Sequence, residues 1–232
     1  MHEYRLYTII PTSRKTQVLN IFAGITASQP VPINQQILIY QQLKAETAPA
    51  FKKGQAKPTT GPGQQARLSH VKLVRDVQGE SAGKWRVREE AIPDPAVRTV
   101  TSQPVVEREL DESVVDKFKL GSEWYRYTSQ YCSSGVRFVH HNVVIYMTRL
   151  YTSGNDTPDT DALDGPPPAL ENASLLDPSG AWLVEVCIRV DDGGNTGLRD
   201  KAVKELEALK RELEGAVDLG MPDRLALDPR VK

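Results

Sequence analysis

The sequence predicts an α+β protein built on one large antiparallel sheet that curls or closes and carries two long helices and one short helix. Three observations predict this fold class. About eight segments have the β-branched or alternating pattern of strands. They come in runs, without the regular strand–helix alternation of doubly wound parallel sheets. The chain has 232 residues, a length that favours a single domain, 1–232, with its own core.

Five strands are predicted in the first half of the chain, at 3–10, 36–43, 67–76, 84–91 and 98–110. The first strand ends at Pro11, and a helix follows around 13–25, where apolar residues recur on one face. Pro104 interrupts the fifth strand. Because proline cannot donate to the hydrogen-bond ladder of a sheet, this strand is expected at an edge or with a bulge.

In the second half, Asp111 is typical of a helix N-cap and Gly121 of a C-terminal stop, which predicts a short helix between them. Three more strands are predicted, at 123–132, 135–151 and 181–190. Only Ser-Ser-Gly separates the first two, which predicts a hairpin with a short turn. A final helix around 196–214 is indicated by one apolar stripe. The stripe consists of Leu198, Ala202, Leu206, Leu209, Leu213 and Val217.

Two segments differ in composition from the predicted helices and strands. Residues 44–66 are rich in Pro, Gly, Gln and Lys, and residues 153–179 carry six acidic side chains and no Lys or Arg. Neither segment contains enough apolar surface to offset the entropy of ordering it. Both are therefore expected to be flexible insertions in the single domain.

Composition excludes several classes of protein. The formal net charge is −1, from 29 basic and 30 acidic side chains, so no global field would attract nucleic acid or an anionic membrane. The longest unbroken apolar run, VVIYM at 143–147, is far too short to cross a bilayer, and the N-terminus does not resemble a secretory signal. Cys132 and Cys187 fall in predicted strands, which favours burial as small apolar residues in a reduced compartment.

Two adjacent histidines, His140 and His141, lie in the predicted strand 135–151. Strand neighbours point to opposite faces, so the pair is not expected to chelate one metal ion, and a structural role is favoured. Both faces of this strand are largely apolar, which predicts cover on both sides by core, helix or a partner. The Gly-rich turn at 191–201 lacks the spacing of phosphate-binding loops, and Asn195 or Thr196 is expected to cap the final helix there.

Charged side chains alternate along three predicted strands. In a closed barrel such rows could line a tunnel and bind a polyphosphate with a metal ion. They could equally form a solvated face, and the solvated or water-filled interpretation is favoured. No hydrolase, redox or metallopeptidase motif is present. The rows are Glu3 and Arg5; Lys84, Arg86 and Arg88; and Glu107 and Glu109, with Arg108 opposite.

Three stretches resemble fungal members of the Mediator subunit 18 family. They are MHEYRLYTIIPTSRKTQVLNIFAGI at 1–25, WRVREEAIPDPAVRTVTSQP at 85–104, and WYRYTSQYCSSGVRFVHHNVVIYMTRLY at 124–151. The motifs are structural rather than catalytic, and the resemblance covers the predicted ordered part of the chain nearly end to end.

The resemblance implies a curled antiparallel sheet that closes into a roughly eight-stranded barrel flanked by helices. It also implies a nuclear protein that pairs with Mediator subunit 20 and is tethered to the Mediator head module by a C-terminal segment of subunit 8. Other head-module subunits and RNA polymerase II would be contacted indirectly, without direct binding of DNA or membrane. Family barrels resemble those of tunnel-type triphosphatases, which use Glu-x-Glu pairs on facing strands. Here Glu107-Arg108-Glu109 is the only plain match on a strand, and the first strand has Glu3-Tyr4-Arg5 instead.

The expected function is therefore that of a structural and interaction subunit of Mediator, a coactivator that links transcription regulators to RNA polymerase II. No catalytic, cofactor-binding or metal-binding residue is predicted. The expected partner surface is apolar and consists of Tyr146, Leu150, Trp182, Leu183 and Val184. Two alternatives stay open, namely a metal-dependent tunnel-type triphosphate phosphohydrolase and a free-standing regulatory binding module.

Overall fold

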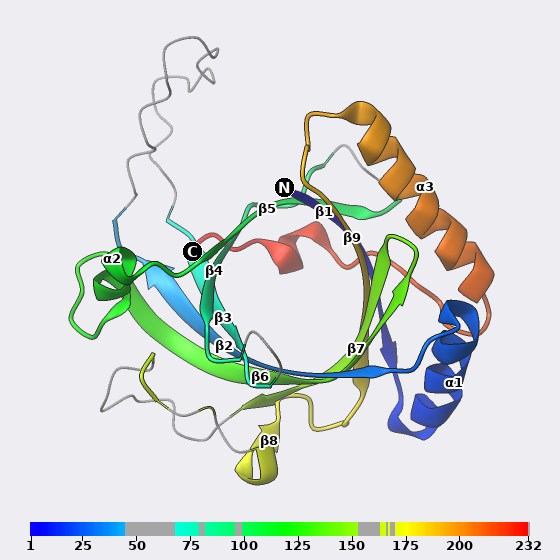
Figure 1. The fold of residues 1–232 in the computed structure, drawn as a ribbon, viewed down its shortest axis with the longest axis horizontal. Coiled ribbons are helices and arrows are strands. Elements are labelled where there is room, and N and C mark those ends of the chain that lie inside the picture. Colours follow the sequence, from blue (N-terminus) through cyan, green and yellow to red (C-terminus); the bar gives the residue numbers. More distant parts are fainter. Residues whose placement is uncertain are drawn as a thin grey trace.

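The computed structural model of the chain describes residues 1–44, 68–78, 82–95, 99–152, 163–165, 167 and 170–231. Its centre is a closed antiparallel barrel with strand order β6-β2-β3-β4-β5-β1-β9-β7, closed by pairing of β6 with β7 (Figure 1). The predicted barrel is thus confirmed. Its strands are β1 (His2–Ile10), β2 (Val31–Gln42), β3 (His70–Asp76), β4 (Trp85–Glu90), β5 (Thr101–Glu109), β6 (Tyr125–His140), β7 (Val143–Thr152) and β9 (Trp182–Val190). A short additional strand, β8 (Ser174–Leu175), pairs only with β7.

Three α-helices are described outside the barrel: α1 (Lys15–Thr26), α2 (Glu112–Val115) and α3 (Thr196–Leu213). Their lengths are 12, 4 and 18 residues, so α3 is the one long helix and α1 is shorter than expected. The predicted caps are confirmed, since Asn195 accepts from the Leu198 amide at 3.2 Å and Asp111 accepts from Ser113 at 2.9 Å. No helix among the described residues is long and apolar enough to span a membrane. Short 3₁₀ turns are η1 (Thr12–Arg14), η2 (Asp116–Phe118), η3 (Leu170–Asn172) and η4 (Arg224–Leu227).

The main core lies between the outer face of the barrel and helices α1 and α3, which cover the β1, β9 and β7 side (Figure 1). Phe22 of α1 meets Phe138 of β6 edge to face at 5.8 Å. Leu206 of α3 and Ile145 of β7 are fully buried in the same core. Burying each such side chain contributes about 1.5–3 kcal/mol. Because the outer face of these strands is apolar, their alternate residues, which point inward, are free to be polar.

A second, smaller core lies on the opposite side of the barrel, under α2 and η2. Phe118 stacks on Tyr125 with ring centroids 4.3 Å apart and meets Tyr40 edge to face at 5.1 Å. Leu163 is buried in this core, and its carbonyl accepts a hydrogen bond from Trp85.

Leu163 and β8 belong to the segment 153–179, one of the two predicted insertions. Leu163 is buried in the second core, and β8 adds a strand to β7. Residues 153–162, 166, 168 and 169 of this segment lie outside the described residues, as does the predicted insertion at 44–66 apart from Lys44.

The predicted hairpin of 123–132 and 135–151 exists, but its turn is misplaced in the prediction. Strand β6 runs without interruption through Ser-Ser-Gly, and the turn lies at His141 and Asn142, with φ of 53° at His141. Gly135 serves a different purpose. A Cβ atom there would lie 2.1 Å from the Met147 carbonyl oxygen, so glycine permits the close approach of β6 and β7.

The expectation of an edge strand or bulge at Pro104 is wrong. Strand β5 pairs with β1 through residues 101–104 and with β4 through residues 105–109, without a register shift. Pro104 therefore lies where the strand changes its neighbour. Ala91, just beyond the end of β4, donates to the Pro104 carbonyl at 3.0 Å. Pro104, which has no N–H to donate, therefore lies outside the residues of β5 that pair with β4.

Candidate functional site

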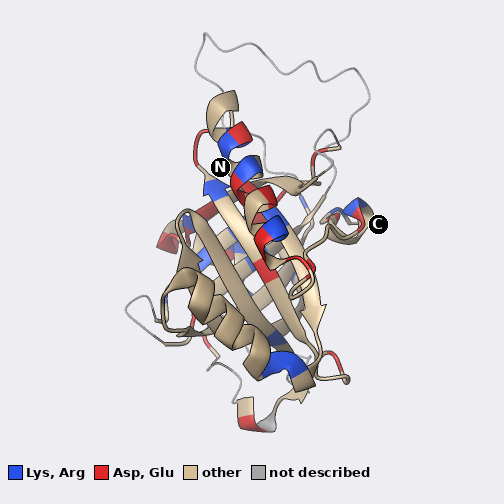
Figure 2. Cartoon of the chain, turned by 90° about the vertical axis from the view of Figure 1, so that its right-hand side faces the viewer, with Lys and Arg blue, Asp and Glu red and all other residues tan. Residues whose placement is uncertain are grey.

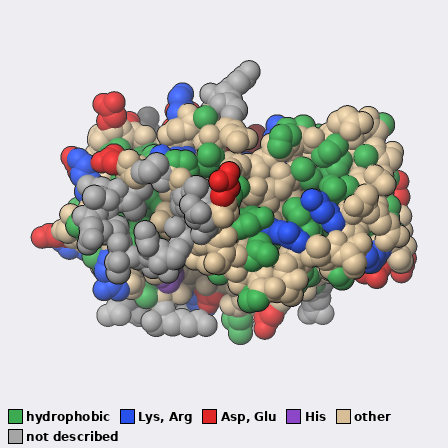
Figure 3. Space-filling view, turned by 90° about the horizontal axis from the view of Figure 1, so that it is seen from below, with side chains coloured by type: hydrophobic (Ala, Val, Ile, Leu, Met, Phe, Trp, Pro, Cys, Tyr) green, Lys and Arg blue, Asp and Glu red, His purple; other side chains and the backbone are tan. Residues whose placement is uncertain are grey.

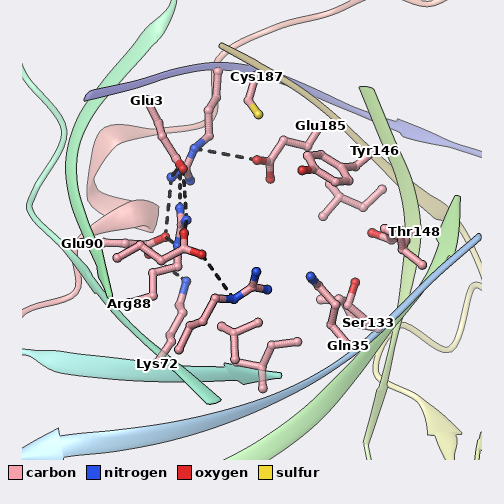
Figure 4. A pocket seen from close by; sticks show the side chains of 18 of the residues that line it. Glu3, Gln35, Lys72, Arg88, Glu90, Ser133, Tyr146, Thr148, Glu185 and Cys187 are labelled. Carbon is pink, nitrogen blue, oxygen red and sulfur yellow. Dashed lines mark hydrogen bonds and ion pairs between the residues drawn. The ribbon is translucent and has the colours of Figure 1, made fainter. Parts of the chain in front are cut away.

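The barrel interior holds a cavity of about 240 Å³ that is lined from all eight barrel strands (Figure 4). Every second residue of a strand points inward, so the alternating charges of the sequence are gathered there. One side, the charged wall, consists of Glu3, Arg5, Lys72, Arg86, Arg88, Glu90, Glu107 and Arg189. The facing side, the neutral wall, consists mainly of Ile33, Gln35, Ile37, Tyr131, Ser133, Tyr146, Thr148, Leu150, Leu183 and Cys187.

Glu3 is the centre of the charged wall and is only 1% exposed. Arg88 binds both of its carboxylate oxygens, at 2.5 and 3.0 Å, and Arg189 Nε lies 2.9 Å from Oε1. Arg5 also donates to Glu3. Burial raises the pKa of Glu3, but the hydrogen bond from Arg88 and the charges of Arg5, Arg88 and Arg189 outweigh it and hold the pKa at about 2. This carboxylate is therefore ionised throughout the physiological range.

Glu90 is the second anchor of the charged wall. Lys72 Nζ lies 2.7 Å from its Oε2, and Arg88 Nε donates to Oε1 at 2.8 Å. Burial raises the pKa of Glu90, but the charges of Lys72, Arg88 and Arg5 lower it further than burial raises it. Arg88 thus bridges Glu3 and Glu90. Burial lowers the pKa of Arg88, but the hydrogen bond to Glu3 and the charges of Glu90 and Glu3 raise it well above the ordinary value, so the guanidinium stays protonated.

Glu107 extends the network toward one end of the barrel. It accepts from Arg88 at 3.1 Å and lies 3.5 Å from Arg86 and 3.6 Å from Arg189. Arg86 also pairs with Asp76 at 3.1 Å. Each of the five cations in the wall therefore lies within ion-pair distance of a carboxylate. An anionic ligand would have to compete with these internal pairs.

The structure separates the charged rows predicted from sequence. Glu3, Arg5, Arg86, Arg88 and Glu107 meet inside the barrel. Lys84, just before β4, and Glu109, the last residue of β5, are exposed. Arg108 pairs with Glu89 at 2.9 Å on the outside of the barrel.

Sequence reasoning missed Lys72, Glu90, Glu185 and Arg189 as cavity residues. A signal was present in the last strand, where Glu185, Cys187 and Arg189 alternate with Val184, Val186 and Ile188.

Among the described residues, no group of three or more His, Cys, Asp or Glu side chains is arranged to hold a metal ion. His140 and His141 are not on opposite faces of one strand, because the chain turns between β6 and β7. Their rings contact each other with centroids 4.4 Å apart. Cys132 and Cys187 lie in β6 and β9, as predicted, and both are buried free thiols.

The five residues expected to bind partners do not form one exposed surface. Tyr146, Leu150 and Leu183 line the cavity. Val184 is fully buried under the helices, and Trp182 is 7% exposed. Two cations cover the indole of Trp182. Lys15 Nζ and Arg149 Cζ lie 4.6 and 4.3 Å from its ring centroid. Three of these residues thus face the cavity, whereas Trp182 and Val184 belong to the core on the helix side of the barrel.

The C-terminal strap, residues 219–231, crosses one end of the barrel (red in Figure 1). Gly220 exchanges two backbone hydrogen bonds of 2.8 Å with Tyr7 of β1. At the far end, His70 of β3 donates to Pro229 at 2.8 Å, and Val231 donates to Leu68 at 2.9 Å. Between them, Arg224 donates to the Pro93 carbonyl at 2.5 Å. The strap thus ties β1 to β3 over the barrel end that holds Glu90 and Lys72.

Comparison with known proteins identifies the family. A sequence model of the family described as Med18 protein matches residues 2–230. The Mediator of RNA polymerase II transcription subunit 18 of Yarrowia lipolytica is 29% identical over 256 aligned residues, covering all of both chains. The same subunit of Coccidioides immitis is 28% identical, again over the full length of both chains.

Among solved structures, a chain of the Schizosaccharomyces pombe Mediator head module matches with a TM-score of 0.66 and 18% identity. The match covers 94% of this chain and 98% of that one, and it shows that the two share a fold. The family match extends over nearly the whole sequence, and the full-length relatives carry the same subunit name. The chain belongs to the Mediator subunit 18 family.

Proposed function

We propose that the chain is a structural and interaction subunit of the Mediator head module and helps to link transcription regulators to RNA polymerase II. One observation carries the proposal, namely the family match over residues 2–230. The paired state of every cation in the charged wall supports a structural barrel rather than a catalytic one. The chain would act in the nucleus, without binding DNA or membrane directly.

The proposed partners are Mediator subunit 20, as a heterodimer, and a C-terminal segment of subunit 8. The exposed face of α1 is a candidate contact surface. No charged residue occurs anywhere in 16–43, and α1 beyond its first residue carries no charge, whereas α3 is charged along its length (Figure 2). Seen from below, apolar and neutral side chains cover much of the half of the molecule that holds α1, with basic groups among them (Figure 3).

Depletion of charge is typical of the centres of protein interfaces, which supports this choice. Gln17, Asn20 and Gly24 are exposed on α1. Gly24 has no side chain, and the space outside it is empty, since a Cβ built there would meet nothing within 4 Å. A partner helix or sheet could therefore approach the backbone of α1 closely at this position. Other head-module subunits and RNA polymerase II would then be contacted through these two partners.

Co-expression tests the proposal. The tagged chain is expected to co-purify with subunit 20 and the subunit 8 segment as one complex. Asn20→Arg places a charge on the proposed contact face and should weaken the complex, whereas Lys210→Glu on α3 serves as the matched control. Both positions are exposed. A wild-type chain that purifies without either subunit would contradict the proposal.

The phosphohydrolase alternative is favoured by one observation, the cavity lined with both carboxylates and basic groups (Figure 4). A triphosphate with a divalent metal would have to break pairs such as Arg88–Glu3 and Lys72–Glu90 before it could bind. Breaking buried pairs costs several kcal/mol each. We therefore propose that the chain is not an enzyme. Metal-dependent release of phosphate from tripolyphosphate would contradict this.

A further inference from the structure

One carboxylate in the cavity differs from the others. Glu185 of β9 lies directly opposite Tyr7 of β1 and opposite Tyr146 of β7. Residues opposite each other in adjacent strands point to the same face and lie about 5 Å apart. The two phenols therefore flank the carboxylate. Tyr146 and Tyr131 of β6 line the cavity, and the Tyr7 hydroxyl accepts a hydrogen bond from Arg5 at 3.1 Å. Figure 4 shows Glu185 next to Tyr146, across the cavity from Lys72 and Arg88.

Glu185 is also the least compensated acid in the cavity. Glu3, Glu90 and Glu107 each accept a hydrogen bond from Arg88. Within the described part of the chain, Glu185 accepts none, and its one cation contact is Arg5 Nε at 3.7 Å. Arg5 is shared with Glu3 and Glu90. The side chain of Glu185 remains 27% exposed, toward the cavity.

The charge balance agrees with this geometry. Burial raises the pKa of Glu185, and the nearby Arg5 and Arg88 charges reduce that rise without reversing it. The pKa values of Glu3 and Glu90, by contrast, are lowered by their cations. Tyr146, opposite Glu185 in β7, and Cys187, two residues along β9, add no charge. Burial raises the pKa of the Tyr146 phenol and of the Cys187 thiol to about 12, which keeps both neutral.

We propose that the cavity binds a primary alkylammonium group, with its nitrogen on the Glu185 carboxylate between Tyr7 and Tyr146. A charge-assisted hydrogen bond would satisfy the open carboxylate, and tyrosine faces attract cations. The alkyl chain would lie along Leu150 and Leu183 of the neutral wall. An anion is a poorer fit, because the cations of the opposite wall are already paired with carboxylates.

The two ends of the barrel differ in access. The strap covers the end near His70 and Glu90, where residues 226–229 line a second cavity of about 370 Å³. At the other end, Val31 and Val139 are 47% and 51% exposed. The ammonium group would enter from the end with these exposed valines, carried either by a free small amine or by a lysine side chain. This inference does not depend on assembly with other Mediator subunits.

The test uses the full chain with ¹³C-labelled tyrosine rings, titrated with n-butylammonium chloride and followed by NMR. The ring signals of Tyr7 and Tyr146, assigned with Tyr→Phe variants, are expected to shift and saturate. Neutral n-butanol and anionic butyrate at the same ionic strength are expected to leave them unchanged. A second titration with Nα-acetyl-lysine methylamide distinguishes a lysine side chain from a free amine, since only a site that accepts lysine would respond to it.

Glu185→Gln keeps the shape of the side chain and is expected to weaken butylammonium binding at least about tenfold, because a hydrogen bond to a charged group is lost. Tyr146→Leu is expected to weaken it as well. The matched control is Glu89→Gln on the outer face of β4, paired with Arg108, which is expected to have no effect. Circular dichroism verifies that each variant is folded. If Glu185→Gln does not fold, Tyr146→Leu carries the test. Unchanged affinity in a folded Glu185→Gln or Tyr146→Leu variant, or saturable binding of butyrate in place of butylammonium, would overturn the proposal.

Discussion

Replacement of Glu3 by glutamine is expected to destabilise the barrel strongly. Glu3 is 1% exposed and contacts three guanidinium groups, those of Arg5, Arg88 and Arg189. Its pKa lies at about 2 instead of the ordinary 4.5. Because one pKa unit corresponds to about 1.4 kcal/mol, the ionised form in the folded state is favoured by ~3 kcal/mol. Removal of one partner of a buried ion pair costs about 3–5 kcal/mol, which agrees in magnitude.

The sign of the pH dependence follows from the lowered pKa. Stability from the Glu3 carboxylate is fully present above pH 4.5, its ordinary value, and is lost as the pH falls toward 2. Urea denaturation at pH 7 should show the loss of ~3 kcal/mol in Glu3→Gln. The difference between the wild type and the variant should shrink as the pH is lowered through this window.

Glu89→Gln is the control, since its pair with Arg108 is exposed and contributes at most about 1 kcal/mol. If Glu3→Gln unfolded at the wild-type urea midpoint, or if its difference from the wild type did not depend on pH, the ion-pair network would not stabilise the barrel as argued.

Two further substitutions and one activity assay test the same structure. Ile145→Asp puts an unpaired carboxylate into the core under the helices, where Ile145 is fully buried, and should prevent cooperative folding as followed by circular dichroism; a soluble protein with a sharp transition would place this face in water. Gly135→Ala should lower stability by about 1–3 kcal/mol in a urea titration, because its Cβ would clash with the Met147 carbonyl; a wild-type midpoint would show that β6 and β7 can move apart without cost. Tripolyphosphate with Mg²⁺ or Mn²⁺ should yield no phosphate in a colorimetric assay, and turnover lost in a Glu107→Gln, Glu109→Gln double variant would contradict a non-catalytic cavity.

The elements were predictable because their patterns are local. The apolar stripe of α3 and the caps at Asn195 and Asp111 depend on neighbours within one or two turns. A glycine is more ambiguous, since it permits either a turn or a close approach of two strands. The Ser-Ser-Gly stretch looked like a turn, whereas Gly135 lies inside β6 for the second reason.

The candidate site was only partly predictable, because it depends on contacts between distant strands. A period of two divides a strand into two faces but does not say which face becomes the interior of a barrel. In β9 the apolar face with Val184 belongs to the core, and the face with Glu185 lines the cavity, a division that the alternation alone does not predict. Arg88 and Glu3 lie 85 positions apart in sequence, so their pairing needed barrel closure to become visible.

Hydrogen exchange tests whether the chain binds Mediator partners through the uncharged outer face of α1 and not through its cavity. Amide exchange of the purified chain is compared with that of its complex with subunit 20 and the C-terminal segment of subunit 8. We expect slower exchange in α1, residues 15–26, on complex formation, with the cavity strands β4 and β5 unchanged. Slower exchange confined to β4 and β5, with α1 unaffected, would contradict it.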